Sequence, residues 1–275
     1  MSRIVIEAGN TEKQYWFDVW RYRELFYFLA WRDILVRYKQ TIIGIAWAVI
    51  RPLLMMLIFV FVRNNFIGNE NLPDVPGPIL IFVAQMPWLF FATALAESSN
   101  SLVVNANLVS KVYFPRLVVP ASSVITSLVD FAISLCLLAG MMAFYQYGPT
   151  YRILYLPVFT LLAFFAALGP GLLFTALNVR YRDFRYIVPF VVQMGLYASP
   201  IMWLMQELSE SPDLQLWVSL NPMVGVINGF RWMFLQGQVE LFLPSLYISI
   251  ASSTLFLLVG IWYFRKTEKT FADVI

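Results

Sequence analysis

Two charged residues inside apolar stretches are the positions of this chain best suited to chemistry. Arg51 is followed by Pro52 about a third of the way into one apolar run, and Asp130 interrupts another. An arginine at the centre of a membrane helix costs about 2.5–3.5 kcal/mol on insertion scales, so a charge in such a place indicates a function. The two residues could form a structural ion pair, or meet a charged or polar solute that crosses the membrane.

Three roles for Arg51 remain open on the sequence alone. Arg51 lies about ten residues, or roughly 15 Å, inside its run, and Asp130 lies at a similar depth in its own run, which favours an intramembrane ion pair. Arg51 could instead face a translocation path, or extend toward the headgroups through a thinned bilayer or a wet vestibule. Pro52 is expected to kink the helix, and a neighbouring helix can bond the carbonyl that the proline frees.

The rest of the sequence offers no catalytic constellation and no metal site. There is no histidine, and Cys136 is the single cysteine, in an apolar run where we expect it to serve packing. This excludes His-dependent general base catalysis, His/Cys metal sites and an intramolecular disulfide. No lysine follows a glycine, so there is no P-loop, and we expect no cofactor in this chain. Energy for any work would therefore come from a partner.

The composition is that of an integral membrane protein. Of the 275 residues, 60% are hydrophobic and 13% are charged, whereas an ordinary soluble domain is about 45–50% apolar and about 25% charged. A membrane helix needs about 20 mostly apolar residues. We predict an all-α fold in a single domain, residues 1–275, with six spans within residues 41–264, at 41–62, 78–96, 117–145, 153–179, 186–206 and 241–264.

The positive charges are distributed unequally between the two sides of these spans. With the N-terminus inside, fifteen Lys and Arg residues fall in cytoplasmic segments, and three, Arg63, Arg152 and Arg231, fall in outer segments. Positive residues accumulate on the cytoplasmic side of membrane proteins. We therefore expect both termini in the cytoplasm, with no cleaved signal peptide at the start.

Two segments outside the spans have distinctive patterns. In residues 14–40 the aromatic residues form one helical stripe and charged residues lie opposite, which predicts an amphipathic helix at the membrane interface. Residues 207–240 are apolar but are interrupted by Asn221-Pro222 and Arg231. This outer segment either enters the membrane and returns, where protein or water satisfies its backbone, or lies on the outer surface.

Two short cytoplasmic loops could receive a docked partner. The first carries Lys111 and Arg116, and the second holds Arg180, Arg182 and Asp183 close together. Each loop joins spans directly, so a partner bound there could push on them. The simpler alternative is that these charges only anchor the helix ends on the cytoplasmic side.

Four stretches, in this order, resemble the permeases of ABC transporters that export polysaccharides such as O-antigen, capsule or teichoic acid. They are RYKQTIIGIAWAVIRPL, LVSKVYFPRLVVP, NVRYRDFRYIVPFVVQMGLYASPIMW and LNPMVGVINGFRWMFLQG. The resemblance implies a homodimer of permeases that pairs with two copies of a separate ATP-binding subunit, which holds ATP and Mg²⁺. It also implies a polymer carried on undecaprenyl pyrophosphate or a comparable lipid.

The resemblance further implies roles for particular residues. Docking of the ATP-binding subunit would fall to part of the 14–40 helix and to the first loop, at Lys111, Val112, Tyr113, Phe114 and Arg116. We add the second loop, at Arg180, Arg182 and Asp183, to the docking surface because of its clustered charges on the same side of the predicted spans. Short re-entrant helices near the outer exit would include Asn221, Pro222 and Arg231. The conduit would be built largely from the first and fifth spans, where the candidates for sugar stacking beside Arg51 are Phe59, Phe61, Tyr197 and Trp203.

The expected function is that of the transmembrane subunit of an ATP-driven exporter, which is not itself an enzyme. It would move lipid-linked polysaccharide, O-antigen above all, outward across the bacterial inner membrane. One alternative is a gradient-driven lipid flippase, which would need several intramembrane carboxylates, whereas only Asp130 lies clearly within a span. The other is a membrane-embedded enzyme of polymer synthesis, which would need a histidine or clustered acids, and Asp183 stands alone in its loop.

Overall fold

The structure is a computed structural model that describes residues 12–39, 44–67, 74–209 and 211–271. Within these residues every regular element is a helix and none is a strand. This confirms the predicted all-α class. The ends of the chain and the predicted connection between the interfacial helix and the first span lie partly outside the described residues.

Five helices are long and apolar enough to cross a membrane, by length and composition. They are α3 (Gly44–Val62) with η1 (Arg63–Ile67), α4 (Gly77–Val104), α6 (Val118–Phe144), η2 (Tyr151–Tyr155) with α7 (Leu156–Arg180), and α11 (Leu243–Thr267) with η4 (Glu268–Thr270). They coincide with five of the six predicted apolar runs.

The remaining run, 186–206, does not form one long helix. Helix α8 (Phe184–Ala198) has 15 residues, fewer than the roughly 20 that a spanning helix needs. It ends at Ser199-Pro200, where Ser199 is extended with ψ of 147°, because a residue before proline is disfavoured in the helical region. The chain then runs irregularly to η3 (Met205–Leu208).

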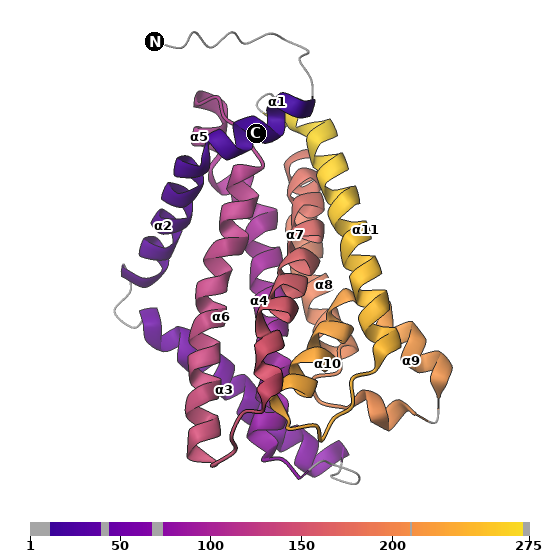
Figure 1. Cartoon of the computed structure of the whole chain (residues 1–275). Coiled ribbons are helices and arrows are strands. Elements are labelled where there is room, and N and C mark those ends of the chain that lie inside the picture. The colour runs from indigo at the N-terminus through magenta and orange to yellow at the C-terminus, as the bar shows by residue number, and fades with distance from the viewer. Residues whose placement is uncertain (1–11, 40–43, 68–73, 210, 272–275) are drawn as a thin grey trace.

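The direction of the helices shows where the chain passes from one end of the molecule to the other. Helices α1 (Glu12–Arg21) and α5 (Ala106–Lys111) and the close of α11 lie at one end, the top of Figure 1, which we call the α1 end. Helices α9 (Pro212–Ser219) and α10 (Pro222–Phe234) lie toward the other, the α9 end. Because α7 finishes near the α1 end and α11 starts near the α9 end, α8 and the irregular segment carry the chain between them.

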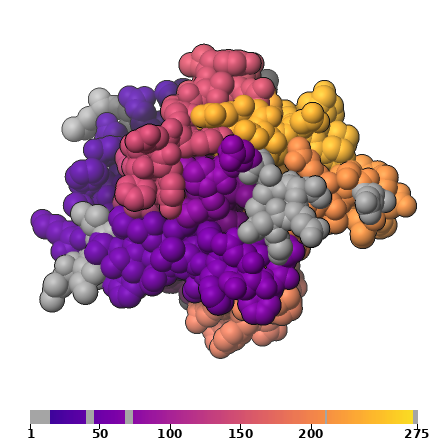
Figure 2. Space-filling view, turned by 90° about the horizontal axis from the view of Figure 1, so that it is seen from below, coloured from indigo at the N-terminus to yellow at the C-terminus, as the bar shows by residue number. Residues whose placement is uncertain are grey.

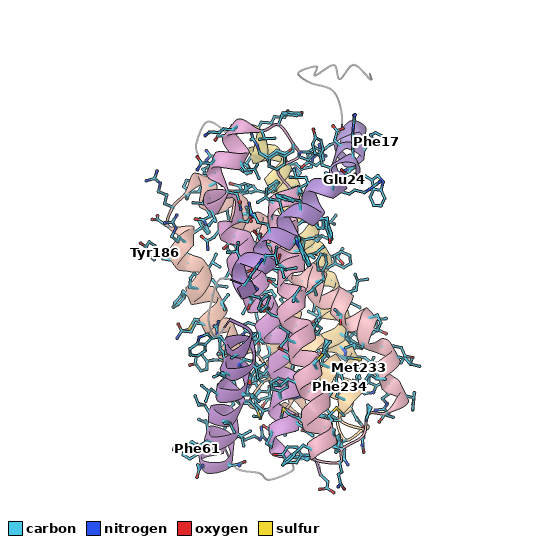
Figure 3. All side chains as sticks on the ribbon, turned by 90° about the vertical axis from the view of Figure 1, so that its left-hand side faces the viewer. Phe17, Glu24, Phe61, Tyr186, Met233 and Phe234 are labelled. Atoms are coloured by element: carbon cyan, nitrogen blue, oxygen red, sulfur yellow. The ribbon has the colours of Figure 1, made fainter. Side chains whose placement is uncertain are left out.

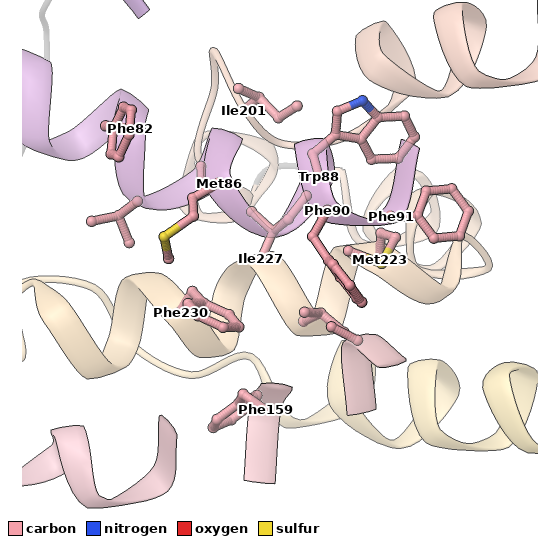
Figure 4. Packing of buried hydrophobic residues seen from close by; sticks show 14 of the residues in the cluster. Phe82, Met86, Trp88, Phe90, Phe91, Phe159, Ile201, Met223, Ile227 and Phe230 are labelled. Carbon is pink, nitrogen blue, oxygen red and sulfur yellow. The ribbon is translucent and has the colours of Figure 1, made fainter. Parts of the chain in front are cut away.

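Helix α4 is the centre of the bundle, and α10 is embedded beside it. In the most apolar stretch of α4, 78% of residues are buried, against 22% in α3 and in α11, so α4 is a core helix and the other two keep a large outward face. Phe230 of α10 lies edge-on to both Phe131 of α6 and Phe159 of α7, with ring centroids 5.9 Å and 6.4 Å away. Figure 4 shows Phe230 and Phe159 within the core. The apolar side of the predicted re-entrant segment is therefore part of the core.

The surface at the α9 end is formed by segments from both halves of the chain. Seen from below, residues of α3 and the start of α4 cover the centre, and α9 lies to one side (Figure 2). Helices α3 and α4 come from the first part of the sequence, whereas α9 follows the irregular segment. This end therefore brings the early spans beside the outer segment predicted at 207–240.

The segment predicted as one interfacial helix is two helices. Helix α2 (Arg23–Lys39) follows α1 after a break at Tyr22, and it packs along α6. Trp20, Tyr27 and Trp31 of the predicted aromatic stripe are all exposed, and Figure 3 shows neighbouring Phe17 projecting from α1. Exposed aromatic rings on a helix beside spanning helices are typical of the lipid interface.

Candidate functional site

Arg37, near the end of α2, holds two carboxylates from two different helices. Its guanidinium donates to Glu97 of α4 and to Asp130 of α6. The neighbouring Tyr38 hydroxyl also donates to Asp130. Burial, and next the bond to Asp130, raise the pKa of Tyr38 above its ordinary value, so its hydroxyl stays protonated and remains a donor. This group ties the predicted interfacial helix to two spans.

The structure gives Asp130 a different partner from the one predicted. Arg51 does not pair with Asp130, and it forms no ion pair with any residue in the described part of the chain. Arg37 and Tyr38 replace Arg51 because α2 packs along α6 and brings its last turn against Asp130. The sequence signal for this was two acids that both needed a cation, Asp130 within an apolar run and Glu97 just after the end of another.

Arg51 lines a pocket that also contains the Arg37 group. The pocket has a volume of about 340 Å³ and is bounded by α2, α3, α4 and α6. It is lined by Trp47 and Arg51 from α3, Arg37 from α2, Glu97 from α4 and Asp130 from α6. Helix α8 contributes no residue, so the pocket lies away from the first-span and fifth-span conduit that the sequence predicted. Behind it, Gln85 of α4 donates to the Pro52 carbonyl at 2.9 Å.

A second charged group lies toward the α9 end and is built from buried arginines. Arg231 of α10 is fully buried and donates to the carbonyls of Ile201 and Trp203, both at 2.8 Å. Arg63 of η1, 3% exposed, donates to the carbonyl between them, that of Met202, and to the Glu207 carboxylate. Charged donors form strong hydrogen bonds with carbonyl oxygens.

These bonds hold the irregular segment after α8. Three consecutive carbonyls, from Ile201 to Trp203, would otherwise lack helical partners, and buried backbone groups must be bonded. Sequence reasoning placed Arg63 and Arg231 in outer segments. The sequence does not indicate that both side chains are buried, because nothing in it shows that the unpaired carbonyls of the irregular segment lie within reach of these arginines.

Asn221 and Pro222 begin α10 and connect it to the same segment. The Asn221 side chain accepts from the Met223 backbone amide at 3.0 Å, a helix cap, and donates to Ser199 Oγ at 2.9 Å. Pro222 occupies the first turn, where its missing N–H costs nothing. The structure therefore brings all three predicted residues of the re-entrant element, Asn221, Pro222 and Arg231, to the end of the fifth predicted run.

Some of the predicted docking residues are exposed, and others are buried or bonded within the chain. Lys111, Val112 and Tyr113 are exposed at the α1 end, as are Arg180, Arg182 and Asp183 before α8. Phe114 is buried, and Arg116 donates to the carbonyl of Glu268 in η4. These last two residues fix the loop to the helices, and the residues just before them form its free surface.

The predicted aromatic residues of the conduit also divide into two groups. Phe61 and Tyr197 are exposed, and Trp203 is half-buried with its carbonyl bound to Arg231. Phe59 is 7% exposed and packs in the main core cluster. It therefore presents no free ring face in this structure.

The comparison with known families covers most of these helices. A match to the ABC-2 type transporter family covers residues 24–235. The chain belongs to that family. The matched region runs from α2 through α10 and so contains both charged groups and both loops.

This ABC-2 permease is also similar to three curated proteins along nearly all of its length. An O-antigen export system permease protein RfbA from Myxococcus xanthus is 27% identical over 94% of this chain and 98% of the relative. Two proteins of the same name from Klebsiella pneumoniae are 26% and 27% identical, each over 89% of this chain and 92% of the relative.

The family and these similarities identify the general role. The chain is a multi-pass membrane protein and an ABC-2 type transport permease subunit rather than an enzyme. An ABC-2 permease works with an ATP-binding subunit.

Proposed function

We propose that this ABC-2 permease moves a lipid-linked polysaccharide, O-antigen, from the cytoplasmic to the periplasmic side of the bacterial inner membrane. The observation that carries the proposal is the similarity to O-antigen export permeases over 89–94% of the chain. Similarity over nearly the whole chain includes the loops, the interfacial helices and the outer segment together. The lipid end is undecaprenyl pyrophosphate or a comparable carrier.

The proposed topology has six crossings with both termini in the cytoplasm. Helices α3, α4, α6, α7 and α11 supply five crossings. The remaining crossing, fifth in chain order, is formed by α8 with the segment up to η3. Five crossings alone would leave α1 and the C-terminal end of α11 on opposite sides of a membrane. Helix α1 and this end of α11 instead lie at one end of the molecule (Figure 1), which supports a further crossing. Helices α9 and α10 are then the outer re-entrant pair.

The proposed assembly contains two copies of this chain and two ATP-binding subunits. The partner holds ATP and Mg²⁺ and docks on the exposed surface at the α1 end, at Lys111, Val112 and Tyr113 and at Arg180, Arg182 and Asp183. Support for this comes from the exposure of those residues and from the bond that joins Arg116 to η4. A push on the loop would reach α6 and α11 through short connections.

For the polymer path we propose the exposed faces of α3 and α8. Phe61 and Tyr197 offer free aromatic faces there, and Trp203 lies at the end of the irregular segment. Such faces can stack on sugar rings without demanding one sugar sequence. Because Arg231 of α10 donates to the carbonyls of Ile201 and Trp203, a movement of this segment would be transmitted to α10.

The test is deletion of this chain in its host, followed by complementation. We expect loss of surface polysaccharide with accumulation of lipid-linked polymer at the cytoplasmic face, because synthesis continues while export stops. Restoring the chain should restore surface polymer. Undiminished surface polymer would contradict the proposal, and so would complete loss of the polymer, since that would indicate a role in synthesis.

A further inference from the structure

The pocket between α2, α3, α4 and α6 is lined by charged side chains of both signs. Arg37 shares its single positive charge between Glu97 and Asp130, which leaves this group with one excess negative charge. Arg51, on α3, forms no ion pair or hydrogen bond with any residue that the structure describes, and it is exposed. The four charges therefore sum to zero, with one cation unpaired and one negative charge uncompensated within the Arg37 group.

The position of the pocket restricts what can enter it. Its α3 side carries the exposed Trp47 indole, 58% accessible, and its floor is apolar, with Met86, Phe90 and Phe131. It lies where the interfacial helix α2 meets three long apolar helices. Tryptophan is typical of the level where headgroups meet acyl chains. The molecules abundant at that level are membrane lipids, so a lipid headgroup is the natural occupant.

We propose that this pocket binds the headgroup of a phosphoethanolamine phospholipid from the surrounding membrane. The lipid phosphate lies at the Arg51 guanidinium, and the lipid ammonium donates to the Glu97 and Asp130 carboxylates. Guanidinium groups bind phosphate through paired hydrogen bonds. A primary ammonium has three N–H donors for carboxylates, so both ends of the headgroup are matched by opposite charge.

Other headgroups fit less well for stated chemical reasons. A choline headgroup has the same two charges but no N–H donor, so it cannot form hydrogen bonds with the carboxylates. A purely anionic glycerol headgroup can use Arg51 but places no positive charge at Glu97 and Asp130. The inference depends only on the chain lying in a membrane, and it does not depend on the proposed polymer or direction of transport.

The test is a binding titration of the purified full chain by native mass spectrometry, in a detergent that preserves lipid binding. Phosphatidylethanolamine, phosphatidylcholine and phosphatidylglycerol with identical acyl chains are compared. We expect phosphatidylethanolamine to bind most tightly, and Arg51→Met to weaken it about tenfold, as loss of one charge-assisted contact predicts. Arg51→Lys should weaken binding less than Arg51→Met does, because it keeps the positive charge but loses the paired donors of the guanidinium.

Two further variants make the result specific. Glu97→Gln should reduce the preference for ethanolamine over choline, because it weakens the side that binds the ammonium. Arg21→Met removes an exposed arginine of α1 outside the pocket and should leave binding unchanged.

Three results would overturn the inference. Equal binding of all three lipids would do so, as would an equal loss of binding in Arg21→Met. Tighter binding of phosphatidylglycerol, or of an isoprenyl pyrophosphate, with the same dependence on Arg51 would show an anion site instead. The titration uses the chain without its ATP-binding partner, so it can fail while the export test in cells succeeds, and the reverse is equally possible.

Discussion

At the scale of single residues, Arg231 shows how a buried cation can be held without direct contact to a carboxylate. Its guanidinium donates to two backbone carbonyls, at Ile201 and Trp203, each at 2.8 Å. Each carbonyl left unbonded in a buried place costs about 1–3 kcal/mol. We predict that Arg231→Met lowers the free energy of unfolding by about 3 kcal/mol, seen as an earlier thermal transition of the purified chain.

Arg185→Met is the matched control for this prediction. Arg185 is exposed at the other end of the molecule, so the same chemical change should leave the transition within a degree or so of the parent. An Arg231→Met chain as stable as the parent would show that the irregular segment does not depend on these bonds.

Arg37 is the second residue-scale case, because removing it leaves two acids facing each other. Its side chain is 25% exposed, and those of Glu97 and Asp130 are 34% and 29% exposed, so solvent weakens the pairing to about 1 kcal/mol for each carboxylate. We predict that Arg37→Met lowers the thermal transition. Adding Glu97→Gln and Asp130→Asn to Arg37→Met should recover at least half of the loss, because the uncompensated charges are then gone. A triple variant less stable than Arg37→Met would refute this.

At the scale of elements, α7 and α11 pack backbone against backbone. A Cβ atom placed on Gly260 would lie 2.2 Å from the Gly169 carbonyl oxygen, and one on Gly169 would lie 2.5 Å from the Leu257 nitrogen. Small residues allow membrane helices to approach at this distance. We predict that Gly260→Leu forces the helices apart and lowers the free energy of unfolding by about 2–3 kcal/mol, measured as the thermal transition and the monodisperse fraction after purification.

Gly140→Leu is the control, since a Cβ atom there meets nothing within 4 Å. It adds the same side chain to another long helix, α6, and should leave both measurements close to those of the parent. Equal losses in the two variants would indicate a general effect of leucine on insertion, not a requirement of the α7–α11 contact.

At the scale of the whole molecule, the proposed orientation can be tested with the single native cysteine removed. In a Cys136→Ser background, Ser110→Cys lies at the α1 end and Gln238→Cys near the α9 end, and both positions are exposed. We predict that an impermeant maleimide labels Gln238→Cys on intact cells and labels Ser110→Cys only after the inner membrane is opened. Labelling of both positions from outside would rule out the six-crossing topology.

Partner docking is the second prediction at this scale. Tyr113 at the α1 end is 71% exposed, and Tyr151 near the α9 end is 72% exposed. Aromatic residues at interface centres often contribute more than 1 kcal/mol to binding. We predict that Tyr113→Ala lowers recovery of the ATP-binding subunit about fivefold or more in co-purification, whereas Tyr151→Ala does not. Equal recovery in both variants would exclude Tyr113 as a docking residue.

Composition and apolar run length alone determined that this is an all-α membrane protein and placed five of its long helices. They also drew attention to Arg51, Asp130 and the outer segment, because each departs from an apolar pattern. The fifth run, 186–206, was overestimated because Ser199-Pro200 ends α8, an effect of local backbone geometry that a hydropathy window does not measure.

Only the tertiary structure decided the partners of the buried charges. Which cation reaches Asp130 depends on α2 packing along α6, and neither the 93-residue separation of Arg37 and Asp130 nor their types reveal it. Burial of Arg63 and Arg231 likewise depends on unpaired carbonyls that exist only once α8 has ended. A charge inside a membrane protein can be recognised from sequence because its insertion is costly. Its partner is set by contacts between distant segments, and those appear only in the folded chain.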